Sequence, residues 1–268
     1  MKVFAAAATI IAASALTTTN VAADGAEGAP WGYKANDTSM AAPDQWAEHY
    51  PTCGGQRQSP IDIVATTGHT SEKRSLTFSG SCADFNVSQS DESFTASVNG
   101  GSCAVSANGA SYDMRQFHMH VPSEHTLDGQ YLGGEVHFVH SNADSSAMLV
   151  TGVFFKAVEG QSDPWVVSVL DALDKVSANA TASASLTPYA DLVNKAADAQ
   201  GVFNYAGSLT TPACSEIVDW WVVKKPVDAS TADLARLQSQ LRELHITDDG
   251  KNARPVQSLN GRVVTALL

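Results

Sequence analysis

Two histidines that alternate along an extended segment are the residues of this chain best suited to carry chemistry. In the segment 116–120 (QFHMH), a single residue separates His118 from His120. Side chains of a β-strand alternate between its two faces, so both imidazoles would point to one side, and Phe117 and Met119 to the other. Imidazoles one strand step apart can bind the same metal ion.

A third imidazole is expected from the segment 135–140 (EVHFVH). There His137 shares a face with Glu135, whereas His140 lies on the opposite face. Three histidine nitrogens that leave a fourth position open are the ligand pattern of catalytic zinc. A carboxylate beside a ligating imidazole accepts its other N–H and fixes the tautomer. The spacing therefore predicts a Zn²⁺ site built from three histidines.

Other interpretations of these histidines remain open at this point. A single histidine on a strand is usually a structural or surface residue, and metallo-hydrolases and cupins also use the H-x-H pattern. Cysteine ligands are not expected, because the four cysteines are better explained by disulfides. The spacing alone thus predicts a metal ion but not a reaction.

Short β-prone runs separated by turn residues must position this site. Alternating or apolar runs predict strands over 76–78, 94–98, 114–121, 135–140, 148–155 and 218–223. Apolar residues at helical spacing predict helices over 164–173 and 231–244, the second capped by Asp228 or Ser230. Turn formers and isolated aromatic residues predict an irregular arm over 24–52. We therefore expect one mostly-β (α+β) domain.

Composition excludes some classes of function. The chain has 268 residues, 44% of them hydrophobic, which is enough for a continuous core. Its 28 acidic and 16 basic residues give a net charge of −12, which repels phosphate backbones, so nucleic-acid binding is not expected. No segment after the N-terminal leader approaches the roughly 18 apolar residues of a membrane helix, so no membrane span is expected.

The N-terminus has the three parts of a secretory signal peptide. Lys2 precedes the apolar run 5–16, and small residues follow up to Ala23. We expect a signal peptide over 1–23 and a mature chain over 24–268 that is secreted, or periplasmic in a bacterium. Acceptor triplets for glycosylation begin at Asn36, Asn86 and Asn179, and they matter only in a eukaryotic secretory pathway.

Four cysteines in an exported chain predict two disulfides, and arithmetic allows three pairings. Cys82 and Cys103 flank the alternating segment 94–98, which favours a bridge between neighbouring strands. That pairing leaves Cys53 with Cys214.

Beyond this local pattern, the sequence resembles the α-class carbonic anhydrases, especially their microbial, algal and plant branch. The motifs that carry the resemblance occur in the family's order over nearly the whole mature chain. They are 31–33 (WGY), 58–63 (QSPIDI), 116–125 (QFHMHVPSEH), 135–140 (EVHFVH), 207–212 (GSLTTP), Trp220 and 252–255 (NARP).

The resemblance implies a central, largely antiparallel twisted sheet, a few surface helices and a zinc ion at the base of a conical cleft. It implies the zinc ligands His118, His120 and His137. Three further groups would orient these rings: Gln116 for His118, the main-chain carbonyl of Asn252 for His120, and Glu135 for His137.

The resemblance also implies the residues around the reacting atoms. Thr210 would accept a hydrogen bond from zinc-bound hydroxide and donate its own proton to Glu124, because a carboxylate can only accept. The substrate pocket would consist of Val139, Val150, Leu209 and Thr211. The Cys53–Cys214 pairing matches the disulfide of exported family members.

The implied reaction is the reversible hydration of CO₂ to bicarbonate and a proton, with weak ester cleavage as a side activity. Three neutral imidazoles leave most of the zinc charge uncompensated, so bound water ionises near neutral pH, the behaviour that these enzymes exemplify. Fast members export the proton through a histidine, but this sequence has Glu92 at that position. A carboxylate with a pKa of about 4.3 is a poorly matched relay.

Two other functions compete with this one: a non-catalytic binding or storage module of the same fold, and a zinc hydrolase acting mainly on esters. The first usually lacks a zinc ligand, and here all three are present. The remaining histidines are expected to be structural (His125, His140) or on the surface (His49, His69, His245). The oligomeric state is not readable from the sequence.

Overall fold

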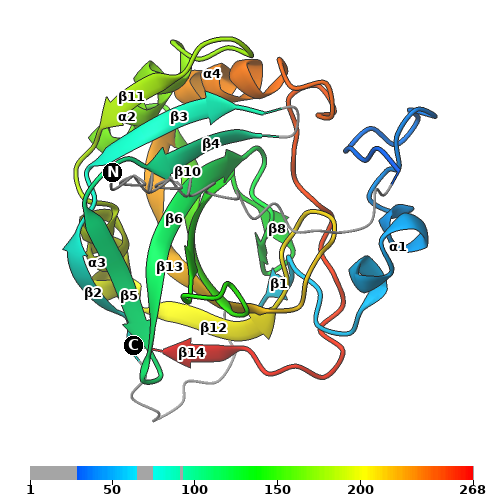
Figure 1. Ribbon diagram of the computed structural model, residues 1–268, viewed down its shortest axis with the longest axis horizontal. Coiled ribbons are helices and arrows are strands. Elements are labelled where there is room, and N and C mark those ends of the chain that lie inside the picture. Colours follow the sequence, from blue (N-terminus) through cyan, green and yellow to red (C-terminus); the bar gives the residue numbers. More distant parts are fainter. Residues whose placement is uncertain (1–28, 65–74, 91–92, 268) are drawn as a thin grey trace, which may run out of the picture.

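A twisted sheet of eleven strands forms the centre of the computed structural model, which describes residues 29–64, 75–90 and 93–267 (Figure 1). The main path of strands runs β11-β3-β4-β6-β9-β10-β13-β12-β14, and β5 pairs with β6 and carries β2. Neighbours are antiparallel except for the parallel pair β10 and β13. The predicted mostly-β fold with a largely antiparallel sheet is confirmed.

The strands of this sheet vary from three to thirteen residues. They are β2 (Thr77–Ser81), β3 (Asp84–Gln89), β4 (Phe94–Val98), β5 (Ser102–Ala107), β6 (Ala110–His120), β9 (Gly134–Ser141), β10 (Met148–Val158), β11 (Ala182–Ser185), β12 (Val202–Gly207), β13 (Val218–Ser230) and β14 (Thr265–Leu267). A second, small sheet contains β1 (Asp62–Ile63), β7 (Thr126–Leu127) and β8 (Gln130–Tyr131).

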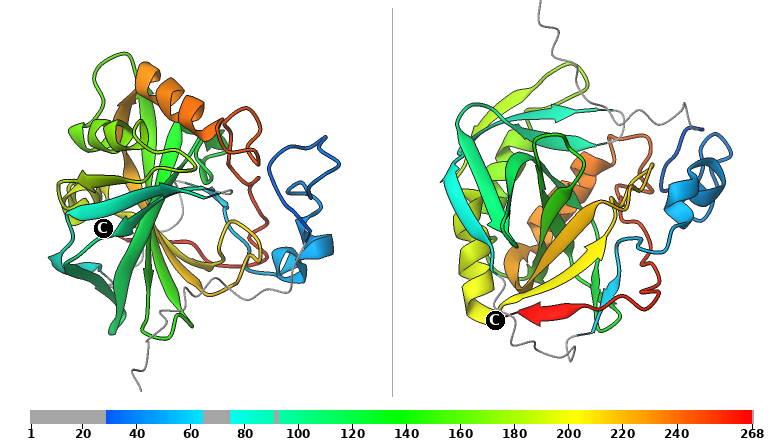
Figure 2. Two further views of the ribbon diagram at one scale, coloured as in Figure 1. Left: turned by 45° about the horizontal axis from the view of Figure 1, so that its top comes forward. Right: turned by 60° about the horizontal axis from the view of Figure 1, so that its bottom comes forward.

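Helices cover one side of the large sheet (Figure 2). They are α2 (Pro164–Leu173), α3 (Tyr189–Gln200) and α4 (Thr231–Leu241), and they are separate from α1 (Trp46–His49) and the 3₁₀ turn Pro51–Gly54 in the N-terminal arm. None of the described helices is long and apolar enough to cross a bilayer.

The helix ends follow from local sequence. Asp163 accepts the N–H of Trp165 at the start of α2, and Ser230 Oγ accepts the N–H of Asp233 at the start of α4. The expected cap of α4 is thus Ser230. This helix ends at Leu241, three residues before the predicted end, because the chain turns there and Thr247 Oγ1 donates to the Leu241 carbonyl.

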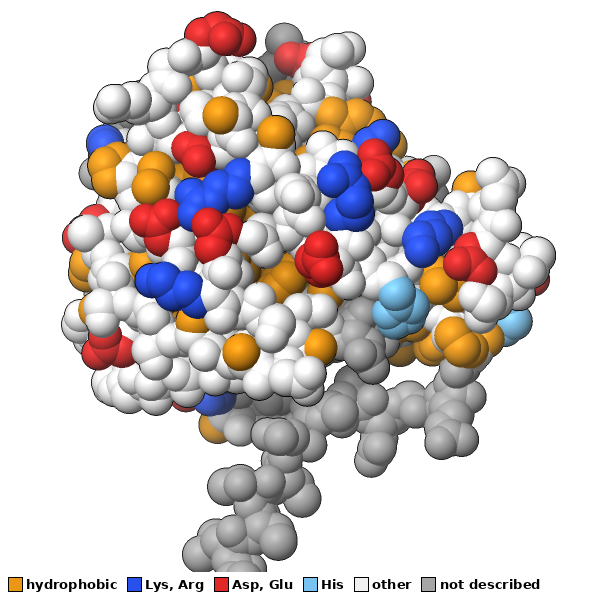
Figure 3. Space-filling model, turned by 90° about the horizontal axis from the view of Figure 1, so that it is seen from above, with side chains coloured by type: hydrophobic (Ala, Val, Ile, Leu, Met, Phe, Trp, Pro, Cys, Tyr) orange, Lys and Arg blue, Asp and Glu red, His pale blue; other side chains and the backbone are white. Residues whose placement is uncertain are grey.

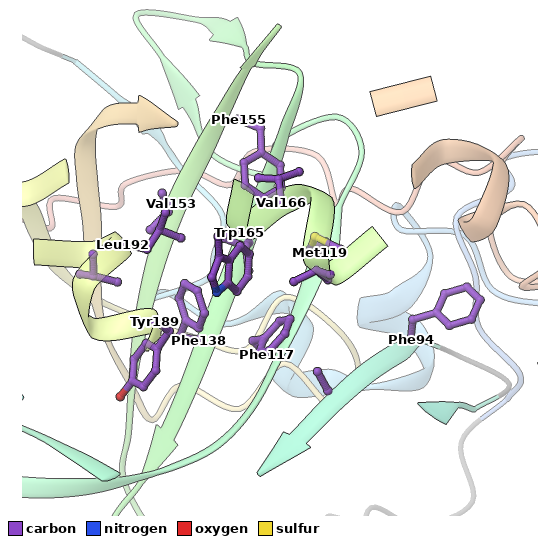
Figure 4. Packing of buried hydrophobic residues seen from close by; sticks show 14 of the residues in the cluster. Phe94, Phe117, Met119, Phe138, Val153, Phe155, Trp165, Val166, Tyr189 and Leu192 are labelled. Atoms are coloured by element: carbon purple, nitrogen blue, oxygen red, sulfur yellow. The ribbon is translucent and has the colours of Figure 1, made fainter. Parts of the chain in front are cut away.

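Apolar side chains fill both faces of the large sheet. Phe117 and Met119 of β6 and Phe138 of β9 point toward α2 and α3, where Trp165 and Tyr189 pack against them (Figure 4). The opposite face has its own buried cluster, which contains Ile61, Val139, Val150, Phe154, Tyr205 and Trp220. Strand alternation therefore divides β6 and β9 into a helix-covered face and a second face that is available for a site.

The N-terminal arm packs through its rings, as its isolated aromatic residues suggested. Trp31, Tyr33 and Trp46 meet edge to face at centroid distances of 5.3–5.9 Å. The Tyr33 N–H donates to the Ile246 carbonyl, which joins the arm to the segment after α4. In Figure 1 these two segments accordingly lie side by side at one edge of the molecule.

The surface carries its charges in mixed clusters. On the face drawn in Figure 3, acidic and basic side chains are interspersed, with hydrophobic ones between them singly or in small groups. Ion pairs of the described residues join opposite charges on the surface: the Arg236 guanidinium pairs with both Asp171 and Asp174. The excess of acidic residues is therefore not gathered into one field on this face.

Candidate metal centre

Three histidines from two neighbouring strands converge on one point. His118 and His120 lie on β6, and the antiparallel register places His118 directly opposite His137 on β9. The ring centroids are 4.5–5.4 Å apart, and one nitrogen of each ring lies within 4.8 Å of the others. Such a cluster has the nitrogen donors and the spacing of a three-histidine metal site.

The outer nitrogen of each ring has a neighbour that fixes its orientation. His118 Nδ1 donates to Gln116 Oε1 at 2.9 Å, and His120 Nδ1 donates to the Asn252 carbonyl at 2.8 Å. His137 Nε2 lies 3.0 Å from Glu135 Oε1. Because carbonyl oxygens only accept, the outer nitrogens of His118 and His120 carry the protons, which leaves their inner nitrogens as lone-pair donors. His137 Nε2 lies close to the Glu135 carboxylate but is not aligned with it for a hydrogen bond.

Asn252 is itself locked to β6. Its Oδ1 accepts the Val121 N–H, its Nδ2 donates to the Met119 carbonyl, and its N–H donates to the Val121 carbonyl. The main-chain oxygen that holds His120 is therefore fixed by three hydrogen bonds to the strand that carries this histidine.

The residues present fit a divalent cation such as zinc. His120 Nε2 and Glu124 Oε2 are buried side-chain atoms without a hydrogen-bond partner, which is costly unless a cation or another group satisfies them. Burial, reinforced by the neighbouring histidines, holds the pKa of His118 well below its usual value, and burial also lowers the pKa of His120. Neutral imidazoles are the form that binds metal.

Glu135 connects the cluster to the protein interior. Its Oε1 lies 2.8 Å from His125 Nδ1 as well as 3.0 Å from His137 Nε2, and its Oε2 accepts the N–H groups of Glu124 and His125. Burial opposes ionisation of Glu135, but His125 and His137 outweigh it and hold the pKa of this carboxyl well below its usual range. Glu135 is thus a buried carboxylate that serves two histidines.

A glycine on the next strand makes room for this carboxylate. The register aligns Gly152 of β10 with His137, and a Cβ atom at Gly152 would lie 2.7 Å from Glu135 Oε1. Any larger residue would displace Glu135, a requirement that the spacing of the histidines did not reveal.

The sequence did not predict the interior partners of His125. His125 Nε2 and the Tyr205 hydroxyl share a hydrogen bond of 2.7 Å, and Tyr205 in turn donates to Ser59 Oγ at 2.9 Å. The Trp220 ring packs edge to face against His125 and His137. His125 is therefore the buried, hydrogen-bonded structural residue that was predicted.

Thr210 lies in a loop that two main-chain hydrogen bonds hold closed. The Leu209 N–H donates to the Ser215 carbonyl at 3.0 Å, and the Cys214 N–H donates to the Thr211 carbonyl at 2.7 Å. Cys214 is bonded to Cys53 across 161 residues. The loop therefore has its far end anchored to the N-terminal arm.

The hydrogen bond from Thr210 to Glu124 that the resemblance implied is not formed in this structure. Glu124 Oε1 accepts the Arg254 N–H at 2.9 Å. Glu124 Oε2 has no hydrogen-bond partner and instead faces the histidines, 3.5 Å from His120 Nε2 and 3.8 Å from His137 Nδ1. The Glu124 carboxylate thus has one oxygen, Oε2, without a donor on the side of the histidine cluster.

The expected substrate-pocket residues divide between two environments. Val139 and Val150 are buried in the second apolar cluster, with Leu209 partly buried against it and Trp220 in the same cluster. Thr211 instead lines a cavity of about 130 Å³ together with His118 and His120. This cavity is also bounded by Trp31, Tyr33, Ser93, Phe94, Thr95, Gln116, Met119 and Asn252.

The remaining predicted residues lie away from the cluster or outside the described residues. Glu92 and His69 belong to the second group, as does the predicted signal peptide. His140 is buried, and its ring nitrogens meet Leu149 and Tyr189. His49 and His245 are exposed.

Both predicted disulfides are present. Cys82 and Cys103 are bonded, as are Cys53 and Cys214, and the described cysteines include no free thiol. The first bridge joins the end of β2 to its partner strand β5, which is a contact between neighbouring strands as expected. The flanked segment β4 is not one of the two strands that it joins.

Comparisons with known proteins agree with this geometry. A family model described as eukaryotic-type carbonic anhydrase matches residues 41–267. The chain is 32% identical to carbonic anhydrase 1 of Mus musculus, over 89% of this chain and 98% of the relative. It is 30% identical to alpha carbonic anhydrase 7 of Arabidopsis thaliana, over 87% of this chain and 82% of the relative.

Solved structures give the same result. The α-carbonic anhydrase of Thermovibrio ammonificans, solved in complex with the inhibitor sulfanilamide, superposes with a TM-score of 0.71 at 32% identity, over 89% of this chain and 99% of the other.

Proposed function

This chain belongs to the eukaryotic-type carbonic anhydrase family, whose members are lyases, and we propose that it catalyses the reversible hydration of CO₂ to bicarbonate and a proton. His118, His120 and His137 would hold the Zn²⁺ cofactor. The observation that carries the proposal is the convergence of their inner nitrogens beside a buried carboxylate oxygen that has no partner.

Zinc held by three neutral imidazoles supplies a hydroxide nucleophile at neutral pH, because it lowers the pKa of a bound water. The chain's own residues keep the site ready for this chemistry. Gln116 and Asn252 hold the protons of the outer nitrogens of His118 and His120, and Glu135, 3.0 Å from His137 Nε2, would do the same for His137, so that each ring presents a lone pair inward.

Thr210 and Glu124 would orient the nucleophile. The Arg254 N–H occupies Glu124 Oε1, so Oε2 is the oxygen left to accept the Thr210 hydroxyl proton. A threonine oxygen that has given its proton to a carboxylate can only accept at its other side, which aims the nucleophile's lone pair at the substrate. This step requires Glu124 Oε2 to turn from the histidines toward Thr210.

The apolar residues Val139, Val150 and Leu209 would form the wall against which CO₂ rests. A molecule without a net dipole gains little from polar partners. Val139 and Val150 belong to one buried cluster on the histidine face of the sheet, and Leu209 packs against it. Thr211 at the cavity would then contact the charged product.

The two disulfides support the view that the mature chain, residues 24–268 after loss of 1–23, works outside the cytosol. Asn36, Asn86 and Asn179 are exposed and could receive glycans in a eukaryotic secretory pathway. Weak ester cleavage is expected as a side activity of the same nucleophile.

Stopped-flow CO₂ hydration on metal-quantified protein tests the proposal. We expect about one zinc ion per chain, with activity lost on chelation and restored by zinc. A folded protein that binds no zinc and lacks activity would favour a non-catalytic module. A larger kcat/KM on esters than on CO₂ would favour a hydrolase.

A further inference from the structure

The cavity beside the histidine cluster is bounded by two hydroxyl side chains in direct contact. Ser93 Oγ and Thr95 Oγ1 are 2.9 Å apart, and either atom can be the donor. Thr95 lies on β4, and both residues line the cavity that also contains His118 and His120. Both hydroxyls therefore face the region where CO₂ hydration would release its proton.

This pair continues toward the surface through Ser90. Ser90 Oγ accepts the Ser93 N–H at 3.0 Å, donates to the Ser93 carbonyl at 3.2 Å and lies 3.5 Å from Ser93 Oγ. The Ser90 N–H also donates to the Ser93 carbonyl. Ser93 and Thr95 are half-buried whereas Ser90 is exposed, so the three hydroxyls lead outward from the cavity.

Among the described residues that line this cavity, only the two metal-binding histidines and Tyr33 have titratable side chains. Tyrosine, with an ordinary pKa near 10, does not hold a proton transiently at neutral pH. The described lining of the cavity therefore has no side chain that can hold the proton transiently. Transfer along its hydroxyl groups is the route that these residues can provide.

Resting on the proposed function, we propose that Thr95, Ser93 and Ser90 form a proton-conducting hydroxyl chain that joins the active-site cavity to bulk solvent. A cavity of about 130 Å³ has room for about four water molecules at ~30 Å³ each. Water in it would donate a proton to Thr95 Oγ1 as Thr95 donates its own to Ser93 Oγ. Ser93 in turn gives its own proton to Ser90 Oγ, while Ser90 turns its hydroxyl from the Ser93 carbonyl and releases its proton to solvent or buffer.

The transfer is balanced at every oxygen. Each hydroxyl gains one proton and loses another, so no oxygen retains a charge, and rotation of the O–H groups resets the chain. The symmetric donor and acceptor capacity of the Ser93–Thr95 pair is what this requires. No charged side chain has to move.

Buffers of two sizes test the proposal, because a small buffer can enter the cavity and a bulky one cannot. We expect Thr95→Val and Ser93→Ala to lower kcat about threefold to tenfold in a bulky sulfonate buffer. This is less than the roughly hundredfold or larger contribution of a positioned acid or base, because water can still carry part of the proton flux. Imidazole should restore most of the loss, and kcat/KM should stay unchanged. Thr95→Ser, which keeps the hydroxyl, should behave like the parent protein.

Ser97→Ala is the matched control. Ser97 shares the strand and face of Thr95, but it is exposed and lies outside the described lining of the cavity, so this change should have no effect in either buffer. Ser93→Ala keeps the three hydrogen bonds that the main-chain groups of Ser93 make with Ser90, and thermal unfolding would verify that each variant folds.

A second readout needs neither metal nor turnover. A neutron structure of the metal-free protein should show a deuterium atom between Ser93 and Thr95 and ordered water that connects Thr95 to the histidine cluster. Equal kcat for parent and variants in the bulky buffer, or a parallel loss of kcat/KM, would overturn the proposal. An inactive parent protein would instead refute the proposed function.

Discussion

Tyr189 donates a hydrogen bond of 2.8 Å to His140 Nε2 and thereby links helix α3 to the central strand β9. The direction follows from the other ring nitrogen, since His140 Nδ1 meets the Leu149 carbonyl at 3.1 Å and must be the donor there. The neutral ring is therefore fixed in one tautomer, on the sheet face opposite the histidine cluster.

This arrangement predicts a specific loss of stability in acid. Burial lowers the pKa of His140 from 6.5 to about 4. Between these two values the unfolded chain binds a proton that the folded chain does not, so the free energy of unfolding should fall as the pH decreases. The slope should reach about 1.4 kcal/mol per pH unit, or about 3 kcal/mol in total.

Urea titrations of the parent protein and His140→Gln across this pH range would measure the difference. Glutamine can accept a hydrogen bond from Tyr189 but does not titrate. The free energy of unfolding of the variant should therefore depend less on pH, with a slope that is smaller by up to about 1.4 kcal/mol per pH unit. Parallel stability curves would show that His140 is not the group responsible.

Removing each disulfide should separate stability from activity. The Cys53–Cys214 bridge closes 161 residues and the Cys82–Cys103 bridge closes 21, so their chain-entropy contributions are about 5 and about 3 kcal/mol as upper limits. Replacing both cysteines of a bridge by alanine should lower the free energy of unfolding, and the loss should be larger for Cys53–Cys214 than for Cys82–Cys103. Only the first should also lower kcat/KM, because Cys214 anchors the loop that contains Thr210. Equal activity of the two variants at a temperature where both are folded would contradict this coupling.

Glu135→Gln should weaken zinc binding about tenfold to a hundredfold, the usual effect of losing a group that orients a metal ligand. The variant removes a charge that His125 and His137 share. Competition with a fluorescent chelator measures the affinity directly. The exposed Glu159 provides the control Glu159→Gln, which should bind zinc as the parent protein does.

Glu92→His should raise turnover in weak buffer. A histidine with a pKa near 6.5 matches a proton donor near neutrality, whereas a carboxylate near 4.3 does not. The parent protein should depend strongly on added buffer. Stopped-flow hydration at several buffer concentrations compares the two, and an unchanged buffer dependence would mean that residue 92 does not stand at the shuttle position.

Aromatic sulfonamides should inhibit in competition with other anions. Their deprotonated nitrogen binds to a metal ion at an open coordination position. The related Thermovibrio ammonificans enzyme was solved in complex with sulfanilamide. Inhibition should disappear in the zinc-free protein. Binding that persists without zinc would place the inhibitor elsewhere.

Local sequence patterns predicted the elements that have strong periodicity. The strand Phe94–Val98 and the helix Pro164–Leu173 have the predicted bounds because alternation marks the first, and a capping Asp before Pro marks the second. The helix Tyr189–Gln200 was missed although Tyr189, Leu192, Val193 and Ala196 are buried at helical spacing. Its many alanine and polar residues weakened that signal. The strands Asp84–Gln89 and Ser102–Ala107 were missed because small and polar residues dominate them.

The same distinction holds for the site. The three histidines are close in sequence, so strand alternation was enough to predict which of them share a face of the sheet. The space that Gly152 leaves for Glu135 depends on strand register. The bonds from His125 to Tyr205 and from Tyr205 to Ser59 join residues 80 and 146 positions apart. No local pattern encodes such contacts.

The parallel pairing of β10 with β13 has a consequence for biosynthesis. The register joins Met148 to Val218, so the sheet is incomplete until a ribosome has translated most of the message. All three histidines lie before this point on adjacent strands, whereas Thr210, Cys214 and Arg254 are translated after β10. A nascent chain thus carries all three imidazoles on adjacent strands well before Asn252, whose carbonyl orients one of them, and Thr210, the proposed catalytic threonine, have been synthesised.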